Sequence, residues 1–242
     1  MSTELNGFHS AFAYWDGDHR TNLSGFFDHW RKQFPEFKIY GNDEIRQLIC
    51  RYFTEYAPEY QSLFDQIRIP AAKADIARLL LLYEFGGLYV DCHCGMRDPV
   101  ETKRIVGRLL DFECIFIDRR LDQIPRLPDE HFLLNAVILS RPKSDLIWMI
   151  ACQALANLAC HRTFEKRVGR IPYHIGSLTG PALVTSMVLQ PDSDNREIRA
   201  DYKGRVLIVR EEDAPVERNR LRNYGGPGQH WYERQSTELL FA

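Results

Sequence analysis

Two side chains with metal-binding chemistry stand close together in the run Asp91-Cys92-His93. In an extended segment, residues two positions apart point to the same side, so the Asp91 carboxylate and the His93 imidazole would face one ligand together. A carboxylate with an imidazole suits Mn²⁺ or a similar divalent ion that takes its other ligands from phosphates or water. The spacing therefore indicates a divalent-metal site, and the simpler alternative is a strand end with a surface acid and histidine.

Two thiols, Cys92 and Cys94, flank His93 and would point away from the metal side. They leave open a thiolate zinc site made of Cys92, His93 and Cys94, and a redox protein that uses the two thiols. The zinc alternative is weak because the run lacks the usual two-residue gap and a second pair of ligands. The redox alternative is weak because the other cysteines occupy apolar stretches, where free cysteine behaves as a small hydrophobe.

Asp75 and Arg78 form a second pair of side chains with relevant chemistry. Three residues apart on a helix, they would share one face. An aspartate accepts hydrogen bonds from sugar hydroxyls, and an arginine neutralises phosphate or spans neighbouring oxygens with its planar fork. From the spacing alone, an ion pair within the helix is the simpler interpretation.

The most clearly patterned part of the chain positions these residues. In Lys73–Phe85 the apolar residues follow helical spacing, and Gly86-Gly87 supplies the positive φ that ends a helix. A short apolar strand, Leu88–Val90, follows at once and ends at Asp91. Ligands bind at the carboxyl ends of strands in open α/β sheets, so this arrangement predicts a binding site at Asp91.

Apolar, β-prone stretches alternate with helical patterns along the whole chain, which predicts an α/β fold with a mostly parallel sheet flanked by helices in a single domain. The expected strands are 11–15, 37–40, 88–90, 114–117, 135–139 and 205–209. The expected helices are 23–34, 43–56, 73–85, 145–159 and 178–189. We expect a long loop over 118–131 and a glycine-rich mobile loop over 223–235.

Composition narrows the classes of function. The 242 residues have room for one catalytic unit, and 45% hydrophobic with 26% charged residues is typical of a globular protein. A formal net charge of −2 argues against non-specific nucleic-acid binding. No apolar run is long enough to span a bilayer and no leader pattern opens the chain, so we expect a cytoplasmic protein with reduced thiols, for which peripheral membrane association stays open.

The dense block over 72–93 resembles the core of glycosyltransferases that bind sugars through a DxD motif. It reads Ala-Lys-Ala-Asp-Ile-Ala-Arg at 72–78 and Leu-Tyr-Glu-Phe-Gly-Gly-Leu-Tyr-Val-Asp-Cys-His at 82–93. The family includes mannosyltransferases, capsular-polysaccharide transferases and clostridial toxin glucosyltransferases. Its pattern is Ser-Asp, Arg three residues later, an aliphatic stretch, Gly-Gly, an aromatic residue and Asp-x-Asp, and Ala74 in place of the serine is a minor departure. Weaker similarity covers Trp15, Asn135, Thr179-Gly180-Pro181, His230 and Trp231.

The resemblance implies a GT-A fold, in which a Rossmann-like half binds a nucleotide sugar and a second half binds the acceptor. Residues 1–95 would be mainly the nucleotide-sugar half, 96–222 the acceptor half and 223–242 a C-terminal segment that closes over the diphosphate. The implied reaction moves a hexose or N-acetylhexosamine from a nucleotide-diphosphate sugar, with a UDP-sugar favoured, to a glycan, lipid-linked glycan or protein. It implies Mn²⁺ or Mg²⁺, retention of anomeric configuration and a place in polysaccharide biosynthesis.

Roles for individual residues follow from the same resemblance. Asp75 and Arg78 would hold the donor sugar and phosphate, and Asp91 would meet ribose, sugar and metal. Asn135 would contact the donor sugar, and Trp15 would lie on the nucleobase. The implied catalytic residues are Asp91, Arg78 and Asn135; the implied metal ligands are Asp91, His93 and His230; the implied substrate contacts are Trp15, Asp75, Arg78, Gly87, Asp91, Asn135 and Trp231.

One departure from the family pattern matters, because His93 stands where the second acid of the motif would be. Polypeptide N-acetylgalactosaminyltransferases use an Asp-x-His version, so histidine is compatible with metal binding, although imidazole is a softer and neutral ligand. The departure leaves a second function open: a catalytically degenerate protein of the same fold that binds a nucleotide sugar or glycan. The sequence nominates no catalytic base, and the departing phosphate is the implied proton acceptor.

Overall fold

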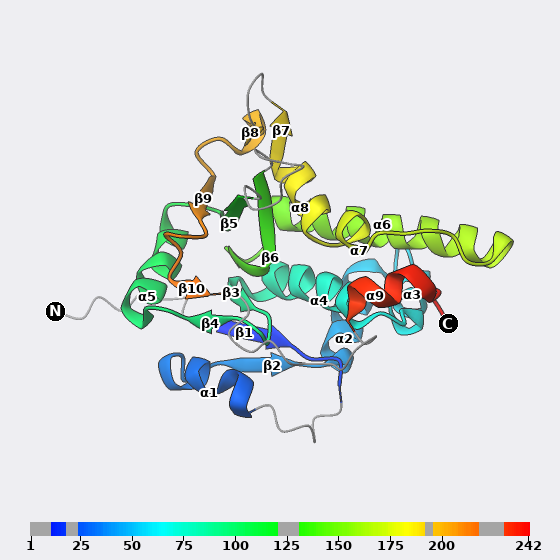
Figure 1. Cartoon of the computed structure of the whole chain (residues 1–242), viewed down its shortest axis with the longest axis horizontal. Coiled ribbons are helices and arrows are strands. Elements are labelled where there is room, and N and C mark those ends of the chain that lie inside the picture. The colour runs from blue at the N-terminus through cyan, green and yellow to red at the C-terminus, as the bar shows by residue number, and fades with distance from the viewer. Residues whose placement is uncertain (1–10, 18–23, 121–130, 192–195, 218–229) are drawn as a thin grey trace.

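A six-stranded sheet forms the centre of the protein (Figure 1). The computed structural model describes residues 11–17, 24–120, 131–191, 196–217 and 230–242. Within these residues the strands are β1 (Ala11–Tyr14), β2 (Lys38–Tyr40), β3 (Gly87–Val90), β4 (Gly95–Met96), β5 (Cys114–Arg120), β6 (His131–Ser140), β7 (Leu189–Pro191), β8 (Arg196–Ile198), β9 (Val206–Arg210) and β10 (Val216–Glu217).

The strand order in the central sheet is β2-β1-β3-β6-β5-β9, and two smaller sheets pair β4 with β10 and β7 with β8. Three of the five neighbouring pairs are parallel, namely β1–β2, β1–β3 and β5–β9, while β6 runs antiparallel to β3 and to β5. All six strands expected from the sequence are strands of this sheet. The predicted α/β fold with a mostly parallel sheet is confirmed.

Helices cover both faces of the sheet. They are α1 (Ser24–Gln33), α2 (Asn42–Phe53), α3 (Glu59–Gln66), α4 (Pro70–Phe85), α5 (Pro99–Gly107), α6 (Asp145–Val168), α7 (Ile175–Leu178), α8 (Pro181–Val188) and α9 (Trp231–Thr237), with 3₁₀ turns at Arg108–Leu110 and Ala200–Tyr202. Figure 1 shows α1 and α5 on one side of the sheet and α2, α3, α4 and α6 on the other. Among the residues described, no helix combines the length and apolar character that crossing a membrane requires.

The side chains of β1 show why helices are needed on both sides. Ala11 and Ala13 belong to the apolar cluster with residues of α1 and α5, whereas Phe12 and Tyr14 belong to the larger cluster with residues of α2, α4 and α6. Successive residues of a strand face opposite sides. An uninterrupted apolar run is therefore what a strand buried on both faces requires.

Helix α4 is buried on almost all sides and leads directly into β3. It begins with Pro70, because the first helical position needs no backbone donor. It ends at Gly86, whose φ of 64° favours glycine. A Cβ on Gly86 would lie 2.5 Å from atoms of Pro142, so the position also lacks room for a side chain. This turn sets where β3 starts and, four residues later, where Asp91 lies.

Strand β6 carries an irregularity at the middle of the sheet. Phe116 of β5 pairs with Ile138, but the next residue, Ile117, pairs with Leu134, so the pairing skips residues 135–137. Such bulges bend a strand and redirect its side chains, and they are common beside functional sites. Asn135 lies within the skipped segment.

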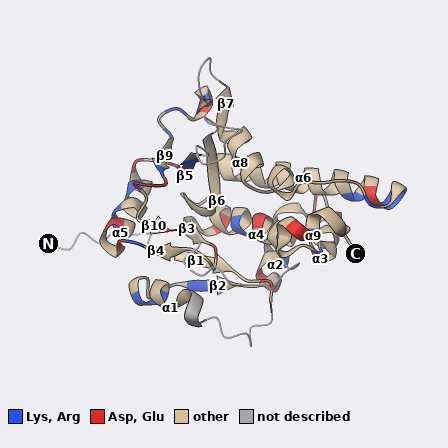
Figure 2. Ribbon diagram, viewed as in Figure 1, with Lys and Arg blue, Asp and Glu red and all other residues tan. Residues whose placement is uncertain are grey.

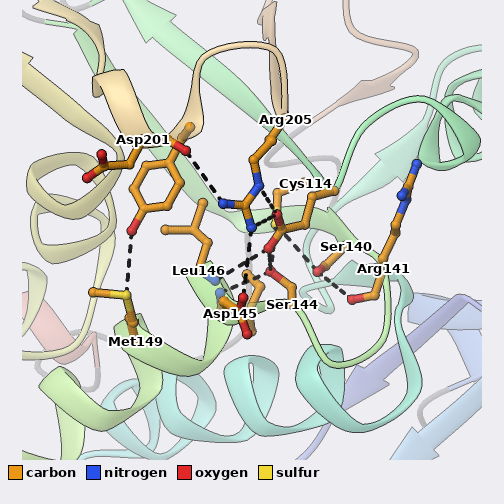
Figure 3. Close-up of polar contacts among 12 residues, drawn as sticks. Cys114, Ser140, Arg141, Ser144, Asp145, Leu146, Met149, Asp201 and Arg205 are labelled. Atoms are coloured by element: carbon orange, nitrogen blue, oxygen red, sulfur yellow. Dashed lines mark hydrogen bonds and ion pairs between the residues drawn. The ribbon is translucent and has the colours of Figure 1, made fainter.

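A polar network holds the amino ends of β5 and β9 to the start of α6 (Figure 3). The Ser144 hydroxyl caps α6 by accepting a hydrogen bond from the Ile147 amide at 3.2 Å, and it lies 3.3 Å from the Cys114 sulfur. Glu113 accepts hydrogen bonds from the Ser144 hydroxyl at 2.6 Å and from Arg205 Nε at 2.8 Å. These contacts fix the edge of the sheet that lies opposite the carboxyl ends of its parallel strands.

Several expected boundaries differ from the structure. The loop expected over 118–131 is partly strand, because β5 and β6 pair as far as Arg120 and His131. The glycine-rich loop expected over 223–235 includes the first turns of α9, while residues 121–130 and 218–229 lie outside those described. The helix expected over 178–189 begins at Pro181, and α3 and α5 lie where the sequence pattern predicts no helix.

Replacing Gly86 by alanine is expected to lower the free energy of unfolding by about 3 kcal/mol or more, because backbone strain adds to the clash with Pro142. Gly204→Ala is the matched control, since Gly204 also has a positive φ, of 79°, but a Cβ there meets nothing within 4 Å. The control should cost about 1 kcal/mol. Urea unfolding of both variants measures the difference, and equal losses would contradict the crowding at Pro142.

Candidate functional site

A cavity of about 850 Å³ lies at the carboxyl ends of β1 and β3, where the chain continues into Trp15 and Asp91. Residues of α4, of the β6 bulge and of the start of α9 complete its walls. Eight of the residues predicted from the sequence line it together: Trp15, Asp75, Arg78, Asp91, His93, Asn135, His230 and Trp231. Gly87 is the exception, because it is buried at the start of β3, pairs with Ser140 and does not line the cavity.

Arg78 lies between two carboxylates in the cavity wall. Its Nη1 donates to Asp75 Oδ1, and its Nη2 donates to Asp91 Oδ1 at 2.9 Å. The guanidinium carbon lies 5.1 Å from the centre of the Tyr89 ring, and the Tyr89 hydroxyl donates to the same Asp91 oxygen at 2.8 Å. Arg78 is only 3% exposed. Burial disfavours the charged guanidinium, but attraction to Asp91 and Asp75 outweighs burial and raises the pKa of Arg78.

Asp75 accepts hydrogen bonds from two further elements. Asn135 Nδ2 donates to its Oδ1 at 2.7 Å, and the Thr179 hydroxyl donates to its Oδ2 at 2.7 Å. Burial raises the pKa of Asp75 to about 6, although Arg78 and the Thr179 hydrogen bond act in the opposite direction. A Cβ on Gly180 would lie 3.2 Å from Asp75 Oδ2. The Thr179-Gly180 turn, a weak match in the sequence, therefore packs directly against the site.

These contacts change the role expected for Arg78. The resemblance implies that Arg78 holds the donor phosphate, but both of its terminal nitrogens donate to carboxylates. Its Nε is buried with no hydrogen-bond partner among the residues that the structure describes. Arg78 therefore positions Asp75 and Asp91. One guanidinium with two carboxylates carries a net negative charge, so a phosphate in this cavity requires other cations.

The segment from Asp91 to Cys94 is a turn, and the expectation of an extended segment was wrong. The Cys94 amide donates to the Asp91 carbonyl at 2.9 Å, which closes the turn. Asp91 and His93 nevertheless both line the cavity. The Cys94 carbonyl accepts a hydrogen bond from Trp30 Nε1 at 3.0 Å, so the far end of the turn is anchored to α1.

The two thiols beside His93 lie in environments that suppress thiolate formation. Burial, with a smaller effect of the Asp91 charge, raises the pKa of Cys92 to about 12 and the pKa of Cys94 well above its usual value. All six cysteines of the chain are described, and each is a free thiol. Reactive cysteines need a lowered pKa, so the structure disfavours the redox alternative. The zinc alternative is disfavoured because the described side chains of Cys92, His93 and Cys94 do not form a group that could hold a metal ion.

The predicted metal ligands Asp91, His93 and His230 do not form a three-residue metal site. Within the described ranges, no group of three or more His, Cys, Asp or Glu side chains is arranged to hold an ion. His230 is occupied differently, because its Nδ1 accepts a hydrogen bond from the Tyr232 amide at 3.3 Å and caps α9. Asp91 and His93 suit an ion that takes its remaining ligands from substrate phosphates and water, which is how Mg²⁺ is commonly held.

Helix α9, which presents Trp231 to the cavity, is anchored through the residues that follow it. Phe241 bridges to Ile67 next to α3, as the adjacent red and cyan segments in Figure 1 illustrate. The buried Glu165 of α6 accepts hydrogen bonds from the Leu240 and Phe241 amides, each at 3.0 Å. The C-terminal segment is therefore attached to the core, contrary to the expectation of a mobile loop over its described part.

Asp16 and Arg119 are two of the charged cavity residues for which the sequence predicted no role. Asp16 lies two residues after the end of β1 and accepts a hydrogen bond from the Tyr14 hydroxyl at 3.4 Å and from Asn42 Nδ2 at 2.5 Å. Its position at the carboxyl end of a strand is a signal that could have identified it. Arg119 lines the cavity from β5, in a stretch where a loop was expected, so no sequence signal placed it at the sheet edge.

Comparisons with known proteins agree with this site. Residues 21–107 match the family of glycosyltransferase sugar-binding regions containing a DXD motif. A segment of 105 residues is 34% identical to an uncharacterised glycosyltransferase of Acanthamoeba polyphaga mimivirus, covering 43% of this chain and 36% of that protein. The chain thus spans about a third of that relative's length. The family resemblance predicted from the sequence is confirmed for this region.

Two solved structures are similar over most of the chain. The PaToxG glycosyltransferase is 14% identical with a TM-score of 0.47, over 75% of this chain and 68% of that one. The ligand-free glycosyltransferase domain of the YGT toxin is 13% identical with a TM-score of 0.38, over 71% of this chain and 52% of that one.

Thr179→Val is expected to cost about 1.5–3 kcal/mol of stability at pH 7.5, because it removes a hydrogen bond to a charged, buried carboxylate. That hydrogen bond lowers the folded-state pKa of Asp75, so its stabilisation is present above pH 6 and is lost as the pH falls through about 6. Urea unfolding at pH 7.5 and pH 5 measures the change.

The matched control for this prediction is Thr163→Val, because the exposed Thr163 hydroxyl donates to the Ala159 carbonyl at 2.9 Å on the surface of α6. Its cost should stay within about 0.5 kcal/mol at both pH values. A Thr179→Val loss that is the same at pH 5 and pH 7.5 would show that the hydroxyl does not act on the ionised Asp75.

Proposed function

Because residues 21–107 match the DXD-containing sugar-binding region of glycosyltransferases, we propose that this chain transfers a hexose or N-acetylhexosamine from a nucleotide-diphosphate sugar. A UDP-sugar is the favoured donor, and a glycan, a lipid-linked glycan or a protein is the acceptor. The observation that carries the proposal is the convergence of Asp75, Asp91 and Asn135, from three different elements, on one cavity at the carboxyl ends of parallel strands.

The chain's own residues supply binding and orientation. Asp75, held by Asn135 and Thr179, presents a fixed carboxylate to the hydroxyls of the donor sugar. Trp15 provides an aromatic face for the nucleobase at the end of β1. Trp231, on the anchored α9, borders the same cavity and excludes water from the sugar, which favours transfer over hydrolysis.

A divalent ion, Mn²⁺ or Mg²⁺, would be held by Asp91 and His93 together with the phosphates of the donor. When bound, it stabilises the negative charge that develops on the departing diphosphate. The hydrogen bonds that the Asp91 carboxylate receives from Arg78 and Tyr89 both reach Oδ1. This fixes the carboxylate before any ligand arrives, so little reorganisation is needed on binding.

Retention of configuration is the proposed stereochemical course. Asp75 and Asp91 each accept at least two hydrogen bonds, which makes both carboxylates poor nucleophiles. The bond from the sugar to the diphosphate breaks, the bond to the acceptor oxygen forms, and the acceptor proton passes to the leaving diphosphate. A binding protein without turnover is the second candidate, and the lack of a three-residue metal group among the described residues favours it.

The test is to incubate the protein with UDP-sugars and GDP-sugars, with and without Mn²⁺, and to follow thermal stability and release of nucleoside diphosphate. The correct donor at a hundredfold excess over its dissociation constant should stabilise the fold by about 2.7 kcal/mol. Asp91→Asn should lower metal-dependent turnover by about a hundredfold or more. His93→Ala provides a second variant, since it leaves the Arg78 contacts of Asp91 in place.

Asp111→Asn is the matched control, because Asp111 is exposed and pairs only loosely with Arg108, at 3.4 Å. It should behave like the parent protein. Donor binding without turnover would support the binding protein. If no nucleotide sugar binds and Asp91→Asn behaves like the parent, the proposal is wrong in both forms.

A further inference from the structure

Most charged side chains around the cavity already have a close partner of opposite charge. Arg78 is held by two carboxylates, as described above. Arg234 of α9 forms a two-point contact with Glu238, with nitrogen–oxygen distances of 2.8 and 2.9 Å. Asp16 faces Lys73 at 3.5 Å. None of these cations is therefore available to an anionic ligand without breaking an existing pair.

Arg119 is different. It lines the cavity from β5, and its closest carboxylate among the described residues is that of Glu211, at 3.8 Å. An ion pair of that length, between side chains that are 35% and 27% exposed, is weak in water. The main chain of Arg119 is fixed, because it pairs with Phe132 of β6, which also lines the cavity.

Positive charge does not gather on one face in the part of the chain that Figure 2 colours. Figure 2 shows basic and acidic residues mixed along α5 and towards the end of α6, which agrees with the formal net charge of −2. The Arg78 cluster itself carries a net negative charge. A ligand with two phosphates must therefore find its positive partner at a particular residue of the cavity wall.

We propose that Arg119 binds the diphosphate of the nucleotide donor and is the principal phosphate-binding side chain among the described residues of the cavity wall. The inference rests on the proposed function, since it takes a nucleoside diphosphate as the ligand. Arginine suits the task because its planar fork donates two hydrogen bonds to neighbouring phosphate oxygens. In the sheet order, β6 separates β5 from β3, so Arg119 approaches the ligand from a different wall than Asp91.

The proposal gives the binding of the phosphates to Arg119, whereas the family resemblance implies that Arg78 holds them. Arg78 orients the carboxylates, and Arg119 neutralises the phosphates. Removing Arg119 should therefore weaken binding in proportion to the phosphate content of the ligand, whereas a merely structural residue would weaken all ligands alike.

The experiment titrates uridine, UMP and UDP, and the matching guanosine series, into the parent protein and into Arg119→Gln by calorimetry. We expect Arg119→Gln to bind the preferred nucleoside diphosphate about ten- to a hundredfold more weakly and the nucleoside less than about threefold more weakly. Arg119→Lys should recover part of the loss, because it restores the charge but not the fork.

Arg210→Gln is the matched control. Arg210 lies on β9 opposite Asp118, the residue of β5 that precedes Arg119, and its side chain forms an ion pair with Asp213 at 2.7 Å. It does not line the cavity. It should leave all affinities unchanged. If the parent binds the diphosphate and Arg119→Gln binds it equally well, or loses the nucleoside to the same extent, this inference is overturned. An equal loss in Arg210→Gln would overturn it too. A parent protein that binds no nucleotide of either series would instead refute the proposed function.

Discussion

The buried guanidinium of Arg78 is the constraint on which the rest of the site depends. A charge that is almost entirely removed from water is tolerated only with close, hydrogen-bonded partners. Asp75 and Asp91 supply them, and satisfying both forces α4 and the end of β3 into one relative position. Asn135 and Thr179 then bring the β6 bulge and the turn before α8 to the same point. Four separate segments are thus joined through one ion cluster.

This arrangement has an electrostatic consequence. The cluster that orders the cavity leaves it with surplus negative charge, which would repel a diphosphate. The divalent ion proposed at Asp91 and His93 and the phosphate contact proposed for Arg119 on another wall would both offset that repulsion. Burial, with a smaller effect of the Asp91 charge, raises the pKa of the adjacent thiols Cys92 and Cys94 and so suppresses their ionisation. The oxygen and nitrogen atoms of the cavity side chains, rather than the two thiols, are therefore the groups suited to bind a ligand here.

The two edges of the sheet serve different purposes. At the amino edge, Ser144, Glu113 and Arg205 connect strands to α6 and contribute to stability (Figure 3). At the carboxyl edge, strand ends, a bulge and a turn leave space for a ligand. The C-terminal segment connects the carboxyl edge to the helical layer. Glu165 of α6 accepts hydrogen bonds from the backbone after α9, and Trp231 at the start of α9 borders the cavity.

The sequence by itself determined the strands of the central sheet, helix α4 and the residue types of the site. Periodicity identified all six central strands and α4, since burial on both faces leaves an unbroken apolar pattern, and the spacing of Asp75, Arg78 and Asp91 marked the binding edge. Tertiary structure decided the contacts. The hydrogen bond from Trp30 to Cys94, the skipped pairing at 135–137 and the contact between Arg78 and Asp91 all join segments that are separate in the sequence. The spacing of Asp75 and Arg78 did predict their ion pair within the helix, whereas a local pattern carries no record of partners in other segments. This is why the contact of Arg78 with Asp91 and the place of Arg119 in the cavity were not expected.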